Sequence, residues 1–221
     1  MAKLQGKVRY QQYVKTVSDL PDHEVQLLDP VTEKLIASTK TDEQGSYQFD
    51  VSPGRYVLKT RFAQTEVKRL VQLLPGGAFQ TLSAAEGTRC LSGHAHIQTP
   101  AGEVEARRLA LGEEVWTRAP TGARVPGRVV GLQRSAVGPE YHPLQLALAD
   151  GRRVVLSTGH PLADGRPAGC VHEHETLDGA QVRSLAPVEY DLPVTYDLLV
   201  EGGDGTYWAD GIALGSTMLP K

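Results

Sequence analysis

The segment CLSGHAHIQTPAG, residues 90–102, opens on a cysteine and leads into a short run, His96–Thr99, that predicts a strand. Two later segments complete the pattern: STGHP at residues 157–161 and TYDLLVEGGDGTYWADGIAL at residues 195–214. The residues around Cys90, GTRCLSG, are mostly small and polar, so the backbone can bend there. These three segments determine how the second half of the chain is interpreted.

Taken together, the segments resemble a Hint domain, the autoprocessing fold of inteins and Hedgehog proteins. The family's cysteine is followed by Leu-x-x-x-Thr-x-Ile-x-Thr, and this sequence matches that pattern at Leu91, Ile97 and Thr99. It departs from the family at Ala95, where a threonine is usual, and at His94, where an aspartate often stands. STGHP corresponds to the family's Thr-x-x-His, with Ser157 keeping the hydroxyl of the usual threonine. The resemblance extends over residues 88–217 and implies a Hint-type β-fold.

Cys90 is the candidate nucleophile. A cysteine that directly follows a peptide bond can attack the carbonyl before it, which closes a five-membered ring and gives a thioester. The expected cleavage therefore lies between Arg89 and Cys90, and water or an external amine or thiol resolves the thioester. The simpler alternative, a cysteine that acts as a small buried hydrophobic residue, stays open.

Three further residues are candidates for assisting this step. The departing amide nitrogen needs a proton, and an imidazole with a pKa near about 6.5 is a natural donor. The resemblance implies that His160 protonates the Cys90 nitrogen, that Ser157 hydrogen-bonds the same amide, and that Asp197 assists the first step. The alternatives are a Ser-His hydrolase pair, here without its Gly-x-Ser-x-Gly elbow, and an aspartate satisfied by backbone amides.

The end of the motif departs from splicing inteins. Those proteins end in His-Asn and use the asparagine to cleave the second junction, whereas Gly215-Ser216 stands here and the sequence contains no asparagine. A serine has no side-chain amide nitrogen and cannot form a succinimide. The sequence therefore predicts cleavage without splicing, as in Hedgehog proteins and the non-splicing bacterial intein-like domains.

The first part of the chain predicts half-buried antiparallel strands, because apolar residues alternate with polar ones between explicit turns. Examples are Tyr47, Phe49 and Val51, which follow a turn at 42–45. The expected strands are Lys7–Tyr13, Glu24–Asp29, Lys34–Thr39, Ser46–Val51, Arg55–Phe62 and Glu66–Leu73.

The run TDEQGSYQFDVSPGRYVLKT, residues 41–60, resembles the carboxypeptidase-regulatory-like, or transthyretin-like, β-sandwich. The expected domains are a sandwich over residues 1–84 and a Hint domain over residues 85–221. A Gly-Gly break at 76–77 and the small, polar segment 83–88 predict a linker.

Composition excludes several classes of partner. The net charge is -3 with 23 basic and 26 acidic residues interspersed, so no basic stripe indicates nucleic acid. No apolar run reaches the roughly 20 residues of a membrane span, and no signal peptide is visible. Two cysteines do not make a disulfide framework.

One cluster suggests a competing hypothesis. The sets His94-x-His96 and Cys170-x-His172-x-His174 have period-2 spacing, which would place each set on one face of a strand. Together with Cys90 or Glu173 they could supply zinc ligands. The alternative is that these are solvated polar strand faces.

The prediction from sequence is an all-β protein: an N-terminal antiparallel β-sandwich followed by a Hint-type β-fold that cleaves its own chain once. Its substrate is its own N-terminal domain, and no cofactor is required. The alternative is a non-catalytic surface or assembly module whose Hint fold is inactive or binds metal. The sequence names neither the acceptor nor the compartment.

Overall fold

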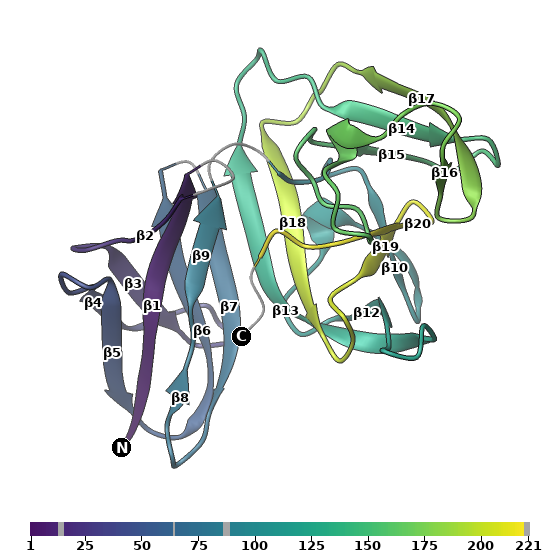
Figure 1. The fold of residues 1–221 in the computed structure, drawn as a ribbon. Helices are drawn as coiled ribbons and strands as arrows, with labels where there is room; N and C mark the ends of the chain where they lie inside the picture. The colour runs from purple at the N-terminus through teal and green to yellow at the C-terminus, as the bar shows by residue number, and fades with distance from the viewer. Residues whose placement is uncertain (13–15, 64, 86–88, 219–221) are drawn as a thin grey trace.

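The computed structural model describes residues 1–12, 16–63, 65–85 and 89–218 (Figure 1). Within these ranges the regular structure is β-strand, apart from the short 3-10 helices η1 (Ala106–Arg108) and η2 (Ala168–Cys170). The predicted all-β class is confirmed. No helix in this part of the chain has the length and hydropathy needed to cross a bilayer.

The N-terminal unit contains the strands β1 (Ala2–Gln12), β2 (Thr16–Asp19), β3 (Glu24–Leu28), β4 (Leu35–Lys40), β5 (Ser46–Val51), β6 (Gly54–Phe62), β7 (Thr65–Leu73), β8 (Ala78–Phe79) and β9 (Leu82–Ala85). The predicted bounds of β5 are correct, and those of β3, β4, β6 and β7 differ by at most one residue at either end. The first strand begins at Ala2 rather than Lys7, and its predicted last residue, Tyr13, lies outside the described residues.

Two sheets face each other in this unit. One has the order β2-β1-β5, with β8 and β9 added to β1 in parallel, and the other is formed by β4, β3, β6 and β7. Their inward residues, such as Leu4, Phe49, Leu58 and Val71, share one buried cluster. The alternation predicted for β5 is seen directly, since Tyr47 and Phe49 are buried and their neighbours are not. The turn before it uses Gly45 at a φ of 69°, a conformation that favours glycine.

The predicted linker at 83–88 is partly wrong. Residues 82–85 form β9, which pairs in parallel with Val8–Gln11 of β1, and residues 86–88 lie outside the described residues. An unpaired edge of β1 offers backbone donors and acceptors that a passing chain can satisfy, so small polar residues can still enter a strand.

The second unit contains β10 (His96–Thr99), β11 (Gly102–Glu105), β12 (Glu114–Arg118), β13 (Arg124–Ala136), β14 (Leu144–Leu148), β15 (Arg153–Leu156), β16 (Thr176–Leu177), β17 (Ala180–Pro187), β18 (Val194–Glu201), β19 (Tyr207–Ala209) and β20 (Ile212–Leu214). The strand predicted at His96–Thr99 is β10. The strands β15-β14-β17-β16 form a separate sheet, and a second buried cluster fills this unit.

Strand β13 joins the two units. It pairs with β12 and β18 of its own unit and, from Gly131 to Ser135, with Arg69 to Thr65 of β7. Figure 1 shows β7 and β13 at the centre of the molecule, where the two halves meet. Leu199 and Met218 of the second unit are buried in the hydrophobic cluster of the first. The units therefore share both a sheet and part of a core.

Candidate functional site

The backbone of Leu91 fixes the position of Cys90. Leu91 exchanges two backbone hydrogen bonds with Tyr196 of β18, and its neighbour Ser92 donates to the carbonyl of Val155 in β15. Leu91 itself is fully buried. The segment is thus held between β15 and β18, which carry or directly precede the other candidate residues.

Ser157 follows β15 and encloses the Cys90 peptide. Its Oγ accepts a hydrogen bond from the Cys90 N–H at 3.1 Å and donates to the Cys90 carbonyl oxygen at 2.8 Å. Its backbone N–H donates to the same carbonyl at 2.9 Å. Because the single hydroxyl proton of Ser157 is already donated, Tyr141 donates its own hydroxyl to Ser157 Oγ at 2.7 Å. The N–H of the Arg89–Cys90 peptide bond therefore donates to a hydroxyl oxygen, Ser157 Oγ, that is itself held in place.

His160 lies on the other side of this peptide bond. A tight turn from Ser157 places the His160 Nδ1 2.6 Å from the carbonyl oxygen of Arg89. A carbonyl oxygen only accepts, so Nδ1 carries a proton and donates it. Burial lowers the pKa of His160, and the charge of Asp197 and the carbonyls of Arg89 and Gly215 act in the opposite direction. In this geometry the imidazole polarises the carbonyl, because its Nδ1–H points to the Arg89 oxygen and not to the Cys90 nitrogen.

Tyr207 connects His160 to Asp197. Its hydroxyl lies 3.1 Å from His160 Nε2 and 3.2 Å from Asp197 Oδ1, and all three side chains are buried. The one hydroxyl proton has two acceptors, a neutral Nε2 and the carboxylate. When Nε2 gains a proton, it can donate to the Tyr207 oxygen while Tyr207 donates to Asp197. Tyr207 can therefore transmit the protonation state of one group to the other.

Cys90 is fully buried in a polar pocket of side chains from β13 and β18. Gln133 Nε2 lies 3.6 Å from its Sγ, and Ser135 Oγ lies 3.7 Å away. Burial, followed by the negative charge of Asp197, raises the pKa of the thiol to about 12, although Ser135 and Thr195 partly oppose this. The Cys90 side chain is therefore a neutral thiol near neutral pH, and Asp197 is close enough for its charge to act on it.

The C-terminal end of the motif reaches the same carboxylate. Asp197 Oδ2 accepts hydrogen bonds from Thr217 N at 2.7 Å, Thr217 Oγ1 at 2.5 Å and Ser216 Oγ at 3.3 Å. Oδ1 accepts from the Leu198 backbone N–H at 2.8 Å. The segment Ser216–Thr217 is therefore held at the carboxylate whose charge also acts on the Cys90 thiol.

Sequence reasoning missed four of these residues: Tyr141, Tyr207, Gln133 and Ser135. Tyr207 lies in the closing segment, residues 195–214, in which the family resemblance points to Asp197. Gln133 and Ser135 continue the period-2 buried face of Val129 and Gly131 in a long strand, but as polar residues on either side of the exposed Arg134 they carry no apolar alternation that would predict their burial.

The predicted zinc ligands are not brought together. Among the described residues no group of three or more His, Cys, Asp or Glu side chains is arranged to hold a metal ion. His94 Nε2 lies 3.1 Å from Asp191 Oδ1, and His96 Nδ1 lies 3.2 Å from Asp210 Oδ1, so each imidazole ring contacts a different carboxylate. The segment with Cys170, His172 and His174 is a 3-10 turn and a loop, with His174 at a φ of 71°. The period-2 argument fails because that segment is not a strand.

Comparison with known proteins identifies the fold of the second unit. No protein-family model and no curated protein matches the sequence. Among solved structures, the chain is similar to the Ssp DnaB mini-intein variant M86, with a TM-score of 0.51, 15% identity, and coverage of 60% of this chain and 95% of that one. It is also similar to a DnaB intein from Synechocystis sp. PCC 6803, with a TM-score of 0.50, 17% identity, and coverage of 58% and 98%.

A third similar structure is the bacterial intein-like domain from Clostridium thermocellum, with a TM-score of 0.50, 18% identity, and coverage of 58% of this chain and 99% of that one. At these identities the similarity defines the fold alone. The second unit thus has a Hint-type, intein-like β-fold. The resemblance of the N-terminal sandwich to carboxypeptidase-regulatory-like domains stays a prediction.

Proposed function

We propose that this protein cleaves its own chain at Arg89–Cys90 by an N-to-S acyl shift, and that the thioester is resolved without splicing. The observation that carries the proposal is the pair of contacts on one peptide bond. His160 Nδ1 donates to the Arg89 carbonyl oxygen, and Ser157 Oγ accepts from the Cys90 nitrogen. The buried thiol that would attack the Arg89 carbonyl belongs to Cys90, the residue that supplies the nitrogen of this peptide bond.

The first step forms a bond between Cys90 Sγ and the carbonyl carbon of Arg89. Negative charge develops on the Arg89 oxygen, where the His160 N–H already donates, and such preorganised donors stabilise the developing charge. Attack by the adjacent side chain needs no diffusion, so proximity supplies much of the rate.

Two protons have to move in this step. The neutral thiol loses its proton, for which Asp197 is the acceptor in our proposal, since its charge reaches the sulfur. The Cys90 nitrogen gains a proton as its bond to the Arg89 carbon breaks, and His160 is the proposed donor because its Nδ1–H contacts the oxygen on the same carbon. A neutral imidazole that gave up Nδ1–H alone would become an imidazolate, so in this proposal the proton taken by Asp197 passes through Tyr207 to His160 Nε2 as Nδ1–H leaves, and the ring ends neutral.

The thioester carries residues 1–89 on Cys90. Water releases them as an acid, whereas an amine or thiol acceptor becomes attached to them. Ser216 has no amide nitrogen for cyclisation, so the second junction keeps its peptide bond. The proposed products are residues 1–89, free or joined to the acceptor, and residues 90–221.

Intact-mass measurement tests this function. Incubation of the full chain with hydroxylamine or a small thiol should release a fragment that ends at Arg89, and Cys90→Ala should abolish release. Cys170→Ser is the matched control, because Cys170 is exposed and lies outside the site. Release that persists in Cys90→Ala would falsify the assignment of the nucleophile.

A reporter fused behind Lys221 tests the absence of splicing. The reporter should remain attached to residues 90–221 in every product. A species in which Arg89 is joined to Thr217 and the reporter, with residues 90–216 excised, would show that the chain splices.

A further inference from the structure

A cavity of about 550 Å³ lies at the junction of the two units. One wall comes from β6 and β7 and the other from β13, β18 and the turn after β18. Cys90, Ser157, His160 and Asp197 are not among its lining residues, so this space is distinct from the site described above.

The cavity opens where the shared sheet ends. The β7–β13 ladder runs from Thr65↔Ser135 to Arg69↔Gly131 and stops there. Next to this point β13 carries an irregularity between Val129 and Gly131, and bulges of this kind bend a strand away from its partner. Beyond the last pair the two strands diverge, and the cavity fills the gap between them.

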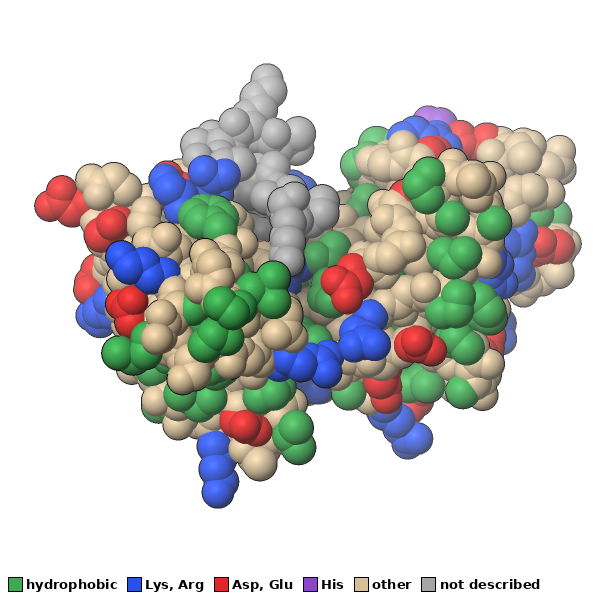
Figure 2. All heavy atoms as spheres, turned by 90° about the horizontal axis from the view of Figure 1, so that it is seen from below, with side chains coloured by type: hydrophobic (Ala, Val, Ile, Leu, Met, Phe, Trp, Pro, Cys, Tyr) green, Lys and Arg blue, Asp and Glu red, His purple; other side chains and the backbone are tan. Residues whose placement is uncertain are grey.

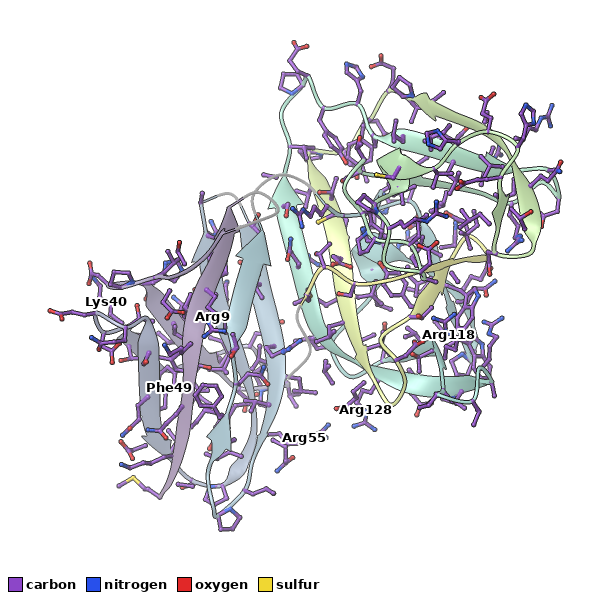
Figure 3. The ribbon with its side chains drawn as sticks, viewed as in Figure 1. Arg9, Lys40, Phe49, Arg55, Arg118 and Arg128 are labelled. Carbon is purple, nitrogen blue, oxygen red and sulfur yellow. The ribbon has the colours of Figure 1, made fainter. Side chains whose placement is uncertain are left out.

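Three arginines line this cavity, two from the first unit and one from the second. Arg69 is buried, and its guanidinium packs over Gly131, where an added Cβ would lie 3.1 Å from Nη1. Arg55 and Arg128 are exposed, and among the described residues neither lies within ion-pair distance of an acid. Figure 3 shows these two side chains extending from opposite units into the gap, and Figure 2 shows basic side chains at the same junction.

Basic side chains outnumber acidic ones among the described residues of the cavity wall. Glu201 is the acid among the described lining residues, set against Arg55, Arg69 and Arg128. The excess positive charge lies in a space with low-dielectric walls, which strengthens its attraction for an anion. Guanidinium groups bind carboxylate and phosphate oxygens in pairs through parallel N–H donors.

Gln80 adds an independent observation. It lines the cavity and is 1% exposed. Its Nε2 donates to the Thr81 carbonyl at 3.0 Å, which fixes the orientation of the amide because a carbonyl only accepts. Its Oε1 is then a buried acceptor with no hydrogen bond within the described part of the chain. Buried acceptors of this kind are normally satisfied, so a bound hydroxyl group would complete the site.

We propose that the junction cavity binds a small hydroxylated oxyanion, with carboxylate or phosphate groups held by Arg55, Arg69 and Arg128 and a hydroxyl donated to Gln80. The ligand bridges the two units, since Arg55 and Arg69 belong to the first and Arg128 to the second. This proposal does not depend on the chemistry at Cys90.

Calorimetric titration of the full chain tests the site, with citrate and inorganic phosphate as probes. Saturable binding of at least one probe with a stoichiometry near one is expected. Arg55→Gln and Arg128→Gln should each weaken binding by roughly tenfold or more, the worth of one charge-assisted hydrogen bond. Both positions are exposed, so these variants should fold. Arg183→Gln removes the same charge from an exposed position of β17 outside the cavity and should leave binding unchanged.

Tricarballylate, which is citrate without its hydroxyl, tests the contribution of Gln80. Weaker binding of tricarballylate than of citrate supports the hydroxyl contact, and equal binding overturns that part of the proposal. Absence of saturable binding of both citrate and phosphate up to roughly 10 mM overturns the site. An equal loss in Arg183→Gln also overturns it, because it would reflect only the net charge of the protein.

Discussion

At the residue scale, the position of the proton on His160 governs the proposed chemistry. The sequence predicts an imidazole that serves the amide nitrogen, but in the structure Nδ1 donates to the Arg89 carbonyl. The ring lies between this carbonyl and the Tyr207 hydroxyl. His160 can therefore stabilise the developing oxyanion first and transfer a proton afterwards.

Tyr207→Phe tests the proton path between Asp197 and His160 separately from the role of His160 as the proton donor. This change removes the hydroxyl between His160 and Asp197 and keeps the ring, so cleavage should slow by roughly tenfold, the worth of one hydrogen bond. His160→Ala should slow it by roughly 10²–10⁴-fold. Thiol-induced cleavage rates from intact mass give both numbers. An unchanged rate in Tyr207→Phe would show that the hydroxyl takes no part in proton movement.

The raised pKa of Cys90 predicts low reactivity of its thiol. At pH 8 an unperturbed thiol with a pKa near about 8.5 is roughly one quarter thiolate, whereas a thiol with a pKa of about 12 has a thiolate fraction of roughly 10⁻⁴. In Cys170→Ser, alkylation of Cys90 by iodoacetamide should be slow and should rise about tenfold per pH unit from pH 7 to 10, since the thiolate fraction grows tenfold below the pKa. Rapid labelling at pH 7, comparable to that of the exposed Cys170 in Cys90→Ala, would contradict this.

At the scale of elements, β13 organises the molecule. Its residues contact the thiol of Cys90, pair with β18, which carries Asp197, and extend the sheet into the sandwich. Gly131 lies where these contacts meet. A Cβ there would come within 2.9 Å of Met218 Cε and 3.1 Å of Leu199 Cβ, which is tighter than side chains normally pack.

Gly131→Val should therefore lower the free energy of unfolding by about 1–3 kcal/mol, the usual cost of overpacking. Gly138→Val is the matched control, because nothing lies within 4 Å of a Cβ at that position. Denaturant melts of both variants provide the comparison. Equal stability of Gly131→Val and the parent chain would show that the junction accommodates the added side chain.

At the scale of the whole molecule, the proposed cleavage at Arg89–Cys90 would cut the chain between two units that pack against each other. Five residue pairs join β7 to β13, and Thr65 Oγ1 lies 3.0 Å from Ser135 Oγ. Leu199 and Met218 are buried in the core of the other unit, and each contributes roughly 1.5–3 kcal/mol by its removal from water.

The two fragments should therefore stay associated after cleavage. On size-exclusion chromatography of the cleaved protein in native buffer, residues 1–89 and 90–221 should elute together, and they should separate in denaturant. Separate elution in native buffer would mean that the shared sheet does not survive loss of the covalent link.

The all-β class, the bounds of β3 to β7 and of β10 to within one residue, and the segments that build the candidate site can all be predicted from the sequence. Alternation of apolar residues and the residue preferences of turns act over a few neighbours, so they are visible without a fold. Cys90, Ser157, His160 and Asp197 were named from motifs that correspond to consecutive residues in strands and tight turns.

Tertiary structure alone decided which atoms meet. Strands that are far apart in the sequence bring His160 Nδ1 to the Arg89 carbonyl and place the Tyr207 hydroxyl between His160 and Asp197. They also separate His94 from the loop that carries Cys170. Long-range pairing also forms β9, because the edge of β1 pairs with a segment for which the sequence predicts a linker. It likewise makes β13 the strand that joins the two units. Strand pairing is set by long-range hydrogen bonds and burial, and neither leaves a local signal in the chain.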